Sequence, residues 1–421
     1  MKVDLAYGRG TLAVDFPDRG TTVIEPRHGV ALADERAALM DSLENPIGSA
    51  ALRDRIWPID RICLLFTDST RATPNERIVP WLLEHLRDHP RENILLMNQL
   101  GTHRPNTHDE LAEMLTPEVL ANYEVVNHDC HDADSLVQIG EMGDGTPALL
   151  NRRAVEADLR IVTGFIEPHF FAGFSGGPKG LMPGVAGLPS VMSNHGFDNI
   201  ADPNATFGVT HGNPLWEELL RIAKLAGPSF LINVTLNESR DITGVYSGSL
   251  EEAHRQGCGR VKQSAMQPVD EAFDIVVTTN SGFPLDQNLY QGVKGMTAAG
   301  RIVKAGGMII LACECSDGIP AGSPFEELLN EVNSADEILG MLSGGGAPRA
   351  EQWQAQIQAL VQSKAEILVR SNLPDEVIRR CHLTPCDDIG RIVNERLAQL
   401  PDDARVAVLP QGPLTIPYLA L

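Results

Sequence analysis

The sequence predicts an α/β protein with two domains, each built on a mostly parallel sheet. Short apolar runs alternate with helical patterns along the chain, which is the arrangement of strands joined by crossover helices. The length of 421 residues exceeds that of one compact domain. A polar, unpatterned segment near residues 266–268 marks the boundary, so we expect an N-terminal domain at 1–267 and a C-terminal domain at 268–421.

The N-terminal domain begins with alternating apolar and polar pieces at residues 2–26, which suggest a small antiparallel element before a helix near residues 31–42. Thr107 and Glu110 have the spacing of a capping box, and Asn75 is a candidate helix cap. Buried strands are expected at the apolar runs 61–66, 93–97, 159–165 and 230–235. In the C-terminal domain, the same rhythm predicts a strand at 273–279, a helix at 285–304, a strand at 306–313 and a helix around Trp353.

The composition excludes several classes of partner. The formal net charge of −22 repels nucleic acid and anionic membrane surfaces. No stretch reaches the roughly 20 apolar residues of a membrane span, and the N-terminus has no apolar signal region. The 7 cysteines, without a repeated CxxC pair, fit reduced thiols better than a disulfide framework. We therefore expect a soluble, cytoplasmic protein that binds neither nucleic acid nor membranes.

Polar side chains follow three successive strands of the predicted N-terminal sheet. Asp68 and Arg71 follow the first strand, His103 follows the second, and His169 follows the third. Because ligands of open α/β sheets bind outside the carboxyl ends of the strands, these residues predict a shared site at one sheet edge. Taken singly, each histidine has a simpler interpretation as a residue that packs or orients a loop, and Arg71 as a surface charge.

A glycine-rich segment, PHFFAGFSGGPKGLMPGVAG, follows the third strand. Gly176 and Gly177 let backbone amides approach an anion, and Lys179 adds a point charge. The segment matches neither a phosphate P-loop nor a dinucleotide fingerprint. His195, in SNHGF, opens a predicted turn.

The C-terminal domain contributes a second group of polar and aromatic side chains. Tyr290 and Lys294 are four residues apart, so they share one face if this segment is helical, and Gln291 lies beside them. An amphipathic surface helix is the alternative interpretation. Trp353 is ordinarily a core residue.

Together these strings resemble the nickel-dependent lactate racemase family. The matching pieces, in order along the chain, are DSTRATP at 68–74, GTHRPNT at 101–107, the glycine-rich segment at 168–187, SNHGF at 193–197, YQGVK at 290–294 and EQWQAQ at 351–356. The order and the spacing are similar to those of the family, and the key positions show no departure. The resemblance implies a C2 racemase or epimerase of a small 2-hydroxyacid, which transfers hydride reversibly to a tethered nickel pincer nucleotide.

The resemblance also implies a role for each residue. Lys179 matches the lysine that tethers the cofactor, nickel–pyridinium-3,5-bisthiocarboxylic acid mononucleotide, and His195 matches the nickel ligand. His103 and His169 match the acid/base pair. The remaining matches are cofactor contacts at Asp68, Arg71, Gly176, Gly177 and Tyr290, and substrate contacts at Arg71, Gln291, Lys294 and Trp353. Proteins that synthesise the cofactor would be the partners for its loading.

Because both domains supply these residues, we expect the active site in the cleft between them, with a hinge near residues 265–270. Two other functions stay open. One is a zinc-dependent hydrolase that uses His103, His169 and His195 as ligands, although the sequence has no HExxH pair. The other is a non-catalytic protein that only binds the cofactor. Within the family, lactate, malate, phenyllactate and sugar acids all carry the carboxylate and hydroxyl that these residues address.

Overall fold

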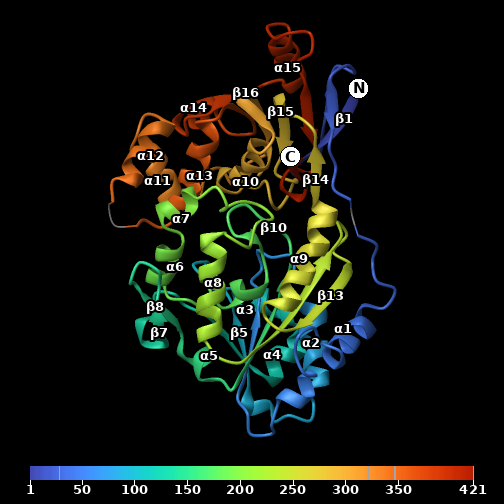
Figure 1. Cartoon of the computed structure of the whole chain (residues 1–421), viewed down its shortest axis with the longest axis vertical. Coiled ribbons are helices and arrows are strands. Elements are labelled where there is room, and N and C mark those ends of the chain that lie inside the picture. The colour runs from blue at the N-terminus through green and yellow to red at the C-terminus, as the bar shows by residue number, and fades with distance from the viewer. Residues whose placement is uncertain (28, 321, 346–347, 421) are drawn as a thin grey trace. The chain divides into compact units, whose positions relative to one another are not determined.

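The computed structural model describes residues 1–27, 29–320, 322–345 and 348–420 (Figure 1). The chain divides into two compact units. Unit 1 comprises Met1–Arg27, Gly196–Ala201 and Gln263–Leu421, and unit 2 comprises His28–His195 and Asp202–Lys262.

This division differs in part from the domains predicted from the sequence. The chain passes from unit 2 to unit 1 for the last time after Lys262, which is close to the expected boundary between residues 267 and 268. The prediction assigned residues 1–27 and 196–201 to the N-terminal domain, whereas the structure assigns them to unit 1. Residues 1–27 belong to unit 1 because β3 (Thr21–Val23) pairs in parallel with β19 (Val406–Leu409) in the sheet of that unit.

Unit 2 is built on a sheet with the strand order β13-β12-β9-β4-β5-β6, in which every neighbouring pair is parallel except β12 with β13. The sheet strands are β4 (Ile62–Phe66), β5 (Ile94–Asn98), β6 (Glu124–Asn127), β9 (Leu159–Phe165), β12 (Ser229–Leu236) and β13 (Ile242–Gly248). The four strands expected from apolar runs are therefore confirmed as β4, β5, β9 and β12. Residues of β4 are buried throughout, which explains why that strand is apolar without alternation.

Helices and short elements join these strands. The helices are α1 (Glu35–Glu44), α2 (Asn75–His85), α3 (His108–Leu115), α4 (Pro117–Asn122), α5 (Arg152–Glu156), α6 (Leu188–Asn194), α8 (Pro214–Leu225) and α9 (Glu252–Ala265). The short 3₁₀ turns are η1 (Leu52–Arg55), η2 (Arg91–Asn93), η3 (Ala133–Ser135) and η4 (Gly177–Gly180), and the small strand pairs are β7 (Leu136–Glu141) with β8 (Pro147–Asn151) and β10 (Pro168–His169) with β11 (Gly173–Phe174).

The two predicted helix caps have different outcomes. The capping box is confirmed, because the Thr107 side chain accepts from the amide of Glu110 and the Glu110 carboxylate accepts from the amide of Thr107. The cap at Asn75 is wrong. Pro74 holds the N-cap position of α2, and the Asn75 side chain instead donates to the carbonyl of Thr67 at 2.8 Å.

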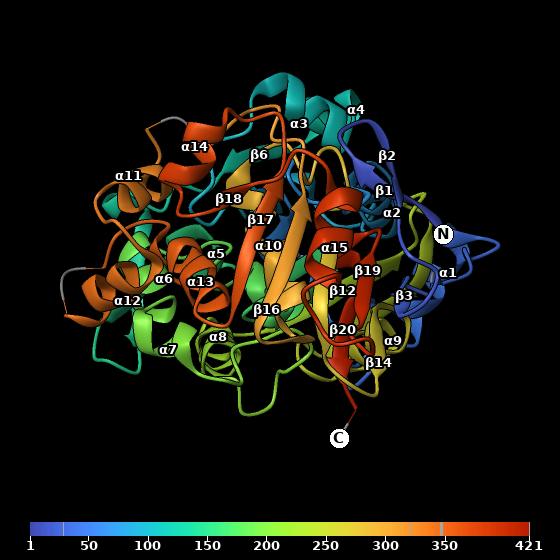
Figure 2. The same ribbon diagram turned by 90° about the horizontal axis from the view of Figure 1, so that it is seen from above.

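Unit 1 is built on a parallel sheet with the strand order β18-β17-β16-β15-β19-β3, part of which is seen from above in Figure 2. Its further strands are β15 (Phe273–Thr279), β16 (Val303–Ala312), β17 (Ala365–Arg370) and β18 (Thr384–Pro385). Its helices are α7 (Phe197–Ala201), α10 (Leu289–Gly300), α11 (Pro324–Asn330), α12 (Ala335–Ser343), α13 (Gln352–Gln362), α14 (Asp375–Arg380) and α15 (Ile389–Leu397), with a 3₁₀ turn η5 (Gly412–Leu414). The mostly parallel α/β architecture predicted from the sequence is thus confirmed in both units.

Smaller elements of unit 1 refine the sequence predictions. The strands β1 (Lys2–Tyr7) and β2 (Gly10–Asp15) form the expected antiparallel hairpin. The segment expected to be unpatterned forms β14 (Met266–Val269), which pairs in parallel with β20 (Ile416–Leu419). Helix α10 begins later than expected, because the side chain of Asn288 caps it by accepting from the amide of Gln291.

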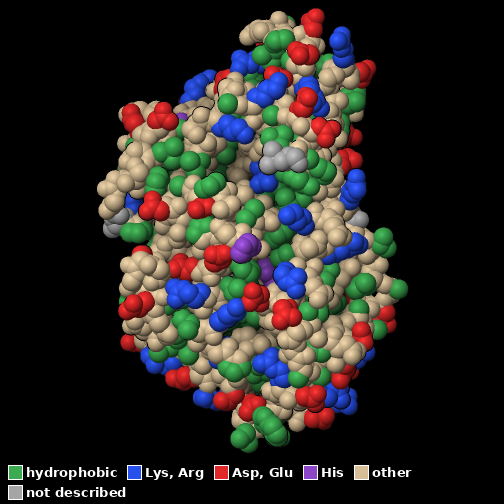
Figure 3. Space-filling model, in the orientation of Figure 1, with side chains coloured by type: hydrophobic (Ala, Val, Ile, Leu, Met, Phe, Trp, Pro, Cys, Tyr) green, Lys and Arg blue, Asp and Glu red, His purple; other side chains and the backbone are tan. Residues whose placement is uncertain are grey.

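The surface carries both signs of charge. On the face drawn in Figure 3, acidic and basic side chains are interspersed among apolar and neutral ones. None of the helices in the described ranges is long and apolar enough to cross a bilayer.

A buried arginine in the sheet of unit 2 donates hydrogen bonds to several backbone carbonyls. Arg160, in β9, is 1% exposed, and its guanidinium donates to the carbonyls of Ala154, Val155, Ala157 and Pro228 at 2.8 to 3.2 Å. Some of these carbonyls belong to the last turn of α5, and the carbonyls in the last turn of a helix have no partners within the helix. The cation therefore satisfies backbone acceptors that are shielded from water.

We expect Arg160→Met to lower the free energy of unfolding by about 3 kcal/mol or more, because several buried carbonyls would lose their donor. Denaturant unfolding of the full chain measures this change. Arg53→Met is the control, because Arg53 is largely exposed and pairs with Glu44 at the surface, and it should change stability by less than about 0.5 kcal/mol. Equal unfolding midpoints for the two variants would contradict this account.

Candidate active site

The strand order of unit 2 reverses between β4 and β9. From β4 the chain proceeds to β5 and β6 on one side, and it then returns to β9 and β12 on the other. Ligands of open α/β sheets bind at such a reversal, outside the carboxyl ends of the strands. Asp68 follows β4 here, and the glycine-rich segment follows β9. The reversal therefore brings together two of the strings that were singled out in the sequence.

Asp68 and His103 form a tight pair. The Nδ1 atom of His103 lies 2.5 Å from Oδ2 of Asp68, and Oδ1 of Asp68 accepts from both the amide and the hydroxyl of Thr70. Burial alone would raise the pKa of Asp68. The hydrogen bond from His103, the charge of His103 and the charge of Arg71 outweigh this effect and lower the pKa of Asp68 to about 2. The carboxylate consequently stays ionised, holds the proton of His103 on Nδ1, and leaves Nε2 as the acceptor of the neutral ring.

Lys179 lies in η4, within the glycine-rich segment. Its side chain is half-buried, and its Nζ is 5.7 Å from the centre of the Phe171 ring. Burial, together with the charge of Arg71, lowers the pKa of Lys179 from 10.5 to about 7, although Glu167 opposes the shift. A large fraction of this amine is therefore neutral near physiological pH.

His195 is the C-cap residue of α6. Its side chain is 5% exposed, and its ring packs edge-on against Phe171 with the ring centres 5.0 Å apart. Burial, and secondarily the charge of Lys179, lower the pKa of His195 to about 3. The ring is therefore neutral at physiological pH, which is the form that binds a metal ion. Phe171 thus contacts both His195 and the region of the Lys179 amine.

His169 has a different proton arrangement from His103. The amides of Phe171 and Ala172 donate to its Nδ1 atom at 3.5 and 3.2 Å. An amide can only donate, so Nδ1 is the acceptor and Nε2 carries the proton in the neutral ring. The His169 ring also stacks on Phe170, with centres 5.0 Å apart. The Nε2 atoms of the two neutral rings therefore differ. Nε2 of His103 can accept a hydrogen bond, whereas Nε2 of His169 can donate one.

The adjacent glycines Gly176 and Gly177 have positive φ angles of 74° and 58°. A side chain at Gly177 would collide with the ring of His254, because an added Cβ would lie 2.5 Å from it. At Gly176, an added Cβ would overlap the side chain of Asn233. The amide of Gly177 donates to Oδ1 of Asn233 at 2.7 Å, so this amide has a partner within the protein.

Arg71 lies three residues beyond Asp68, and its amide donates to the Asp68 carbonyl at 3.2 Å. Among the described residues, none forms a hydrogen bond or an ion pair with its guanidinium. The Arg71 charge nevertheless lowers the pKa values of both Asp68 and Lys179, which indicates that it lies near both groups. Its donors can therefore receive an anion.

The residues predicted in the C-terminal domain lie in unit 1. The indole of Trp353, in α13, donates to the hydroxyl of Tyr290, in α10, at 3.3 Å. Gln291 and Lys294 lie on the same helix as Tyr290, and all three are half-buried. The structure thus brings Trp353 and Tyr290 together, which the sequence spacing alone did not predict.

Three further residues contact the site and were missed from the sequence: Phe171, Asn233 and His254. Phe171 lies within the glycine-rich string but resembles an ordinary core residue. Asn233 and His254 belong to β12 and α9, far from any recognised motif, so only the tertiary structure identifies them.

No group of three or more His, Cys, Asp or Glu side chains within the described ranges is arranged to hold a metal ion. His103, His169 and His195, the three ligands that a zinc hydrolase would require, do not form such a group. A metal bound at His195 would need most of its ligands from elsewhere.

Comparison with known proteins assigns both parts of the chain to one family. Residues 7–208 match the model of the lactate racemase N-terminal domain, and residues 269–416 match that of the lactate racemase C-terminal domain. The lactate racemase of Thermoanaerobacterium thermosaccharolyticum is 34% identical over 418 residues, covering 97% of both chains. The lactate racemase of Lactiplantibacillus plantarum is 36% identical over 419 residues, covering 97% of this chain and 98% of the relative.

Solved structures agree with this assignment. The lactate racemase apoprotein from Thermoanaerobacterium thermosaccharolyticum superposes with a TM-score of 0.93 at 32% identity, covering 99% of this chain and 100% of the other. A protein from Thermotoga maritima shares the fold, with a TM-score of 0.70 at 18% identity and coverage of 93% and 100%. The resemblance noted in the sequence is therefore confirmed, and the chain belongs to the lactate racemase family.

Proposed function

We propose that the protein racemises or epimerises a 2-hydroxyacid at C2, with a nickel pincer nucleotide held at Lys179. Lactate is the first candidate substrate, because relatives that cover nearly the whole chain are named lactate racemase. The observation that supports the proposal best is the grouping in unit 2 of a desolvated Lys179, a neutral, buried His195 and the Asp68–His103 pair.

The substrate chemistry defines what the protein has to do. The C2 hydrogen of a hydroxyacid is a poor proton donor, because its removal would place a carbanion next to a carboxylate. When bound, the pincer cofactor would supply an acceptor that takes this hydrogen as hydride and returns it to either face of the planar ketoacid. The protein's own side chains must then move the hydroxyl proton, hold the carboxylate and fix the cofactor.

The residues of unit 2 fit such a cofactor. A pKa of about 7 gives Lys179 a substantial neutral fraction, which a covalent tether requires. The neutral imidazole of His195 is a good ligand for nickel. Gly176 and Gly177 shape the backbone of the loop that would bear the cofactor.

His103 acts as a base in this proposal. Its Nε2 atom accepts the hydroxyl proton, and the resulting imidazolium is stabilised by Asp68 at 2.5 Å. The side chain of His103 is 41% exposed, which leaves it accessible to a substrate. His169 is the second acid/base group in this proposal and would play for the opposite enantiomer the part that His103 plays here, so two histidines serve the two directions in which the hydroxyl points.

The carboxylate would be bound by cations. Arg71 is suited to a two-point contact, because its planar guanidinium matches a carboxylate. In unit 1, the proposed roles are substrate contacts for Gln291, Lys294 and Trp353 and a cofactor contact for Tyr290. Proteins that synthesise the cofactor are the proposed partners for loading, and the cytoplasm is the proposed compartment.

The decisive experiment is to load the full chain with cofactor and follow optical configuration across lactate, malate, phenyllactate and a sugar acid. We expect inversion of at least one of them, with the C2 hydrogen retained when the reaction runs in heavy water. Complete exchange of that hydrogen with solvent in every turnover would instead indicate proton abstraction. Cofactor binding without turnover of any of these acids would indicate a non-catalytic carrier.

Removing either proposed acid/base group should lower kcat without loss of the cofactor. We expect His103→Gln and His169→Gln each to reduce kcat by roughly 10²- to 10⁴-fold. Mass spectrometry of the intact chain checks that tethering at Lys179 is unchanged. His108→Gln is the matched control, since His108 has a side chain that is 85% exposed. A variant that keeps full activity would remove that histidine from the mechanism.

Lys179→Met should stabilise the cofactor-free chain, because it removes an amine whose charged form is disfavoured by burial. The folded pKa of about 7 lies below the ordinary 10.5, so the unfolded chain binds an extra proton between these pH values. Wild-type stability therefore gains with rising pH through this window. The advantage of Lys179→Met should be largest at and below pH 7 and should shrink by at most about 1.4 kcal/mol per pH unit above it. Denaturant unfolding at several pH values measures the difference, with the exposed Lys224→Met as control. A difference that does not change with pH would contradict the expectation.

A further inference from the structure

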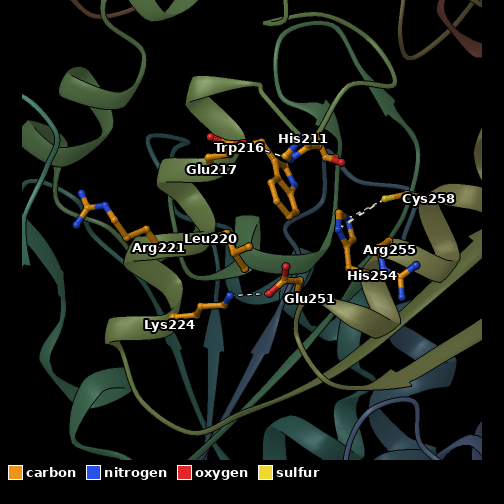
Figure 4. A pocket seen from close by; sticks show the side chains of 11 residues that line it. His211, Trp216, Glu217, Leu220, Arg221, Lys224, Glu251, His254, Arg255 and Cys258 are labelled. Atoms are coloured by element: carbon orange, nitrogen blue, oxygen red, sulfur yellow. Dashed lines mark hydrogen bonds and ion pairs between the residues drawn. The ribbon is translucent and has the colours of Figure 1, made fainter.

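His254 is a buried titratable group that the proposed mechanism does not use. It lies in α9 and is fully buried, at 0% exposure. Figure 4 shows its ring between Trp216 of α8 and Cys258, which is one turn further along α9. The Trp216 and His254 rings are nearly parallel, with an interplanar angle of 12° and centres 6.2 Å apart. Two helices therefore fix the orientation of the His254 ring.

The polar atoms of His254 are directed at the glycine-rich segment. Its Nε2 atom lies 2.8 Å from the carbonyl oxygen of Ser175, and because a carbonyl can only accept, Nε2 carries the proton. The Nδ1 atom is then the acceptor of a neutral ring, and the Cys258 sulfur lies 3.6 Å from Nδ1 and 3.4 Å from Nε2. Burial lowers the pKa of His254 to about 4, a shift that the hydrogen bond to Ser175 opposes and the charge of Lys179 assists. The neutral ring and this tautomer agree with each other.

Contacts from another element hold the same segment. The Gly177 amide donates to Oδ1 of Asn233 at 2.7 Å, and Nδ2 of Asn233 donates to the carbonyl of Ile232. The backbone is therefore held at Ser175 by His254 and at Gly177 by Asn233. Gly177 also approaches the His254 ring so closely that no side chain would fit. Lys179 follows two residues later.

We propose that His254, together with Asn233, is a positioning residue that holds the Ser175–Gly180 backbone so that the Lys179 amine is presented for attachment of the cofactor. The proposal deepens the proposed function and rests on it for the purpose of the amine. Its structural part, the control of the environment of Lys179 by His254, is independent of any cofactor. It can therefore be tested on the cofactor-free chain.

A pocket beside His254 allows a test in which a small solute replaces the His254 ring. It has a volume of about 550 Å³ and is lined by His254, Trp216 and Cys258 together with polar residues of α8 and α9 (Figure 4). A small solute can enter a pocket of this size from solvent. Imidazole is therefore a suitable probe for replacing the ring in a His254→Gly variant.

The experiment measures the reactivity of Lys179 in the full-length, cofactor-free chain. Acetic anhydride labels neutral amines, and peptide mass spectrometry gives the labelling rate of Lys179 against pH, normalised to its plateau. Wild type should show a midpoint near pH 7. We expect His254→Leu to loosen the loop, admit water to the amine and move the midpoint upward by about one pH unit, which makes the normalised rate at pH 7 about fivefold slower.

Matched variants separate positioning from general damage. His254→Gln keeps a donor near the position of Nε2 and should restore most of the wild-type midpoint. Imidazole should restore it in His254→Gly. Asn233→Ala, which removes the second contact, should move the midpoint in the same direction, and it tests the proposal if the leucine variant does not fold. His211→Leu is the control, because His211 lines the same pocket with a fully exposed side chain and should leave the midpoint unchanged.

The outcomes are distinguishable from those of the proposed function. An unchanged Lys179 midpoint in both folded His254→Leu and Asn233→Ala would overturn the positioning role, whatever the enzyme catalyses. An upward shift that His254→Gln and imidazole reverse would support it, even if no 2-hydroxyacid were turned over. In the loaded enzyme, we expect His254→Leu to lower the tethered fraction and kcat while KM stays within about twofold.

Discussion

The candidate site depends on a lysine amine whose charged form is disfavoured by the protein atoms around it. An ammonium ion loses much of its hydration when protein atoms surround it, so the half-buried Lys179 has a lowered pKa of about 7, at the expense of folding stability. That enclosure requires a loop that closes tightly on itself. The glycines at 176 and 177 are needed for this reason, because His254 and Asn233 occupy the space that side chains would take. Phe171 supplies an apolar surface on another side.

The strand order reverses once in each of the two main sheets, but the two reversals have different surroundings. In unit 2, the reversal between β4 and β9 leaves Asp68 and the glycine-rich segment at the carboxyl edge. In unit 1, the strand order reverses between β15 and β19, but that place is filled. The hydroxyl of Thr279 donates to the carbonyl of Pro410 at 3.0 Å, and Gly412 packs directly against the Thr279 backbone. A strand reversal therefore creates an opportunity for a site, and the following loops decide whether it is used.

Much of the fold could be predicted because buried parallel strands are continuous apolar runs, as β4 and β9 are. The positions of Asp68, His103 and Lys179 were also predictable, since each follows such a run. Asn233 and His254 could not be found in this way. A single polar residue within a strand or a helix has no local pattern, and its partners lie 56 and 79 residues away along the chain. The pairing of β3 with β19 was missed for the same reason, because three residues of strand contain no information about a partner at the other end of the sequence.

That pairing has a consequence for how the protein is made. The strands β1, β2 and β3 are synthesised long before β19, the strand that lies beside β3. Until β19 is made, β3 therefore has no place in a finished sheet, whereas unit 2 has all of its strands once β13 has been made. A recombinant fragment that starts at residue 268 would leave the edge of β19 uncovered, and an uncovered edge invites association with other chains. Unit 1 thus depends on segments that lie nearly 400 residues apart along the chain: |406 − 21| is 385 for the pair Val406 and Thr21.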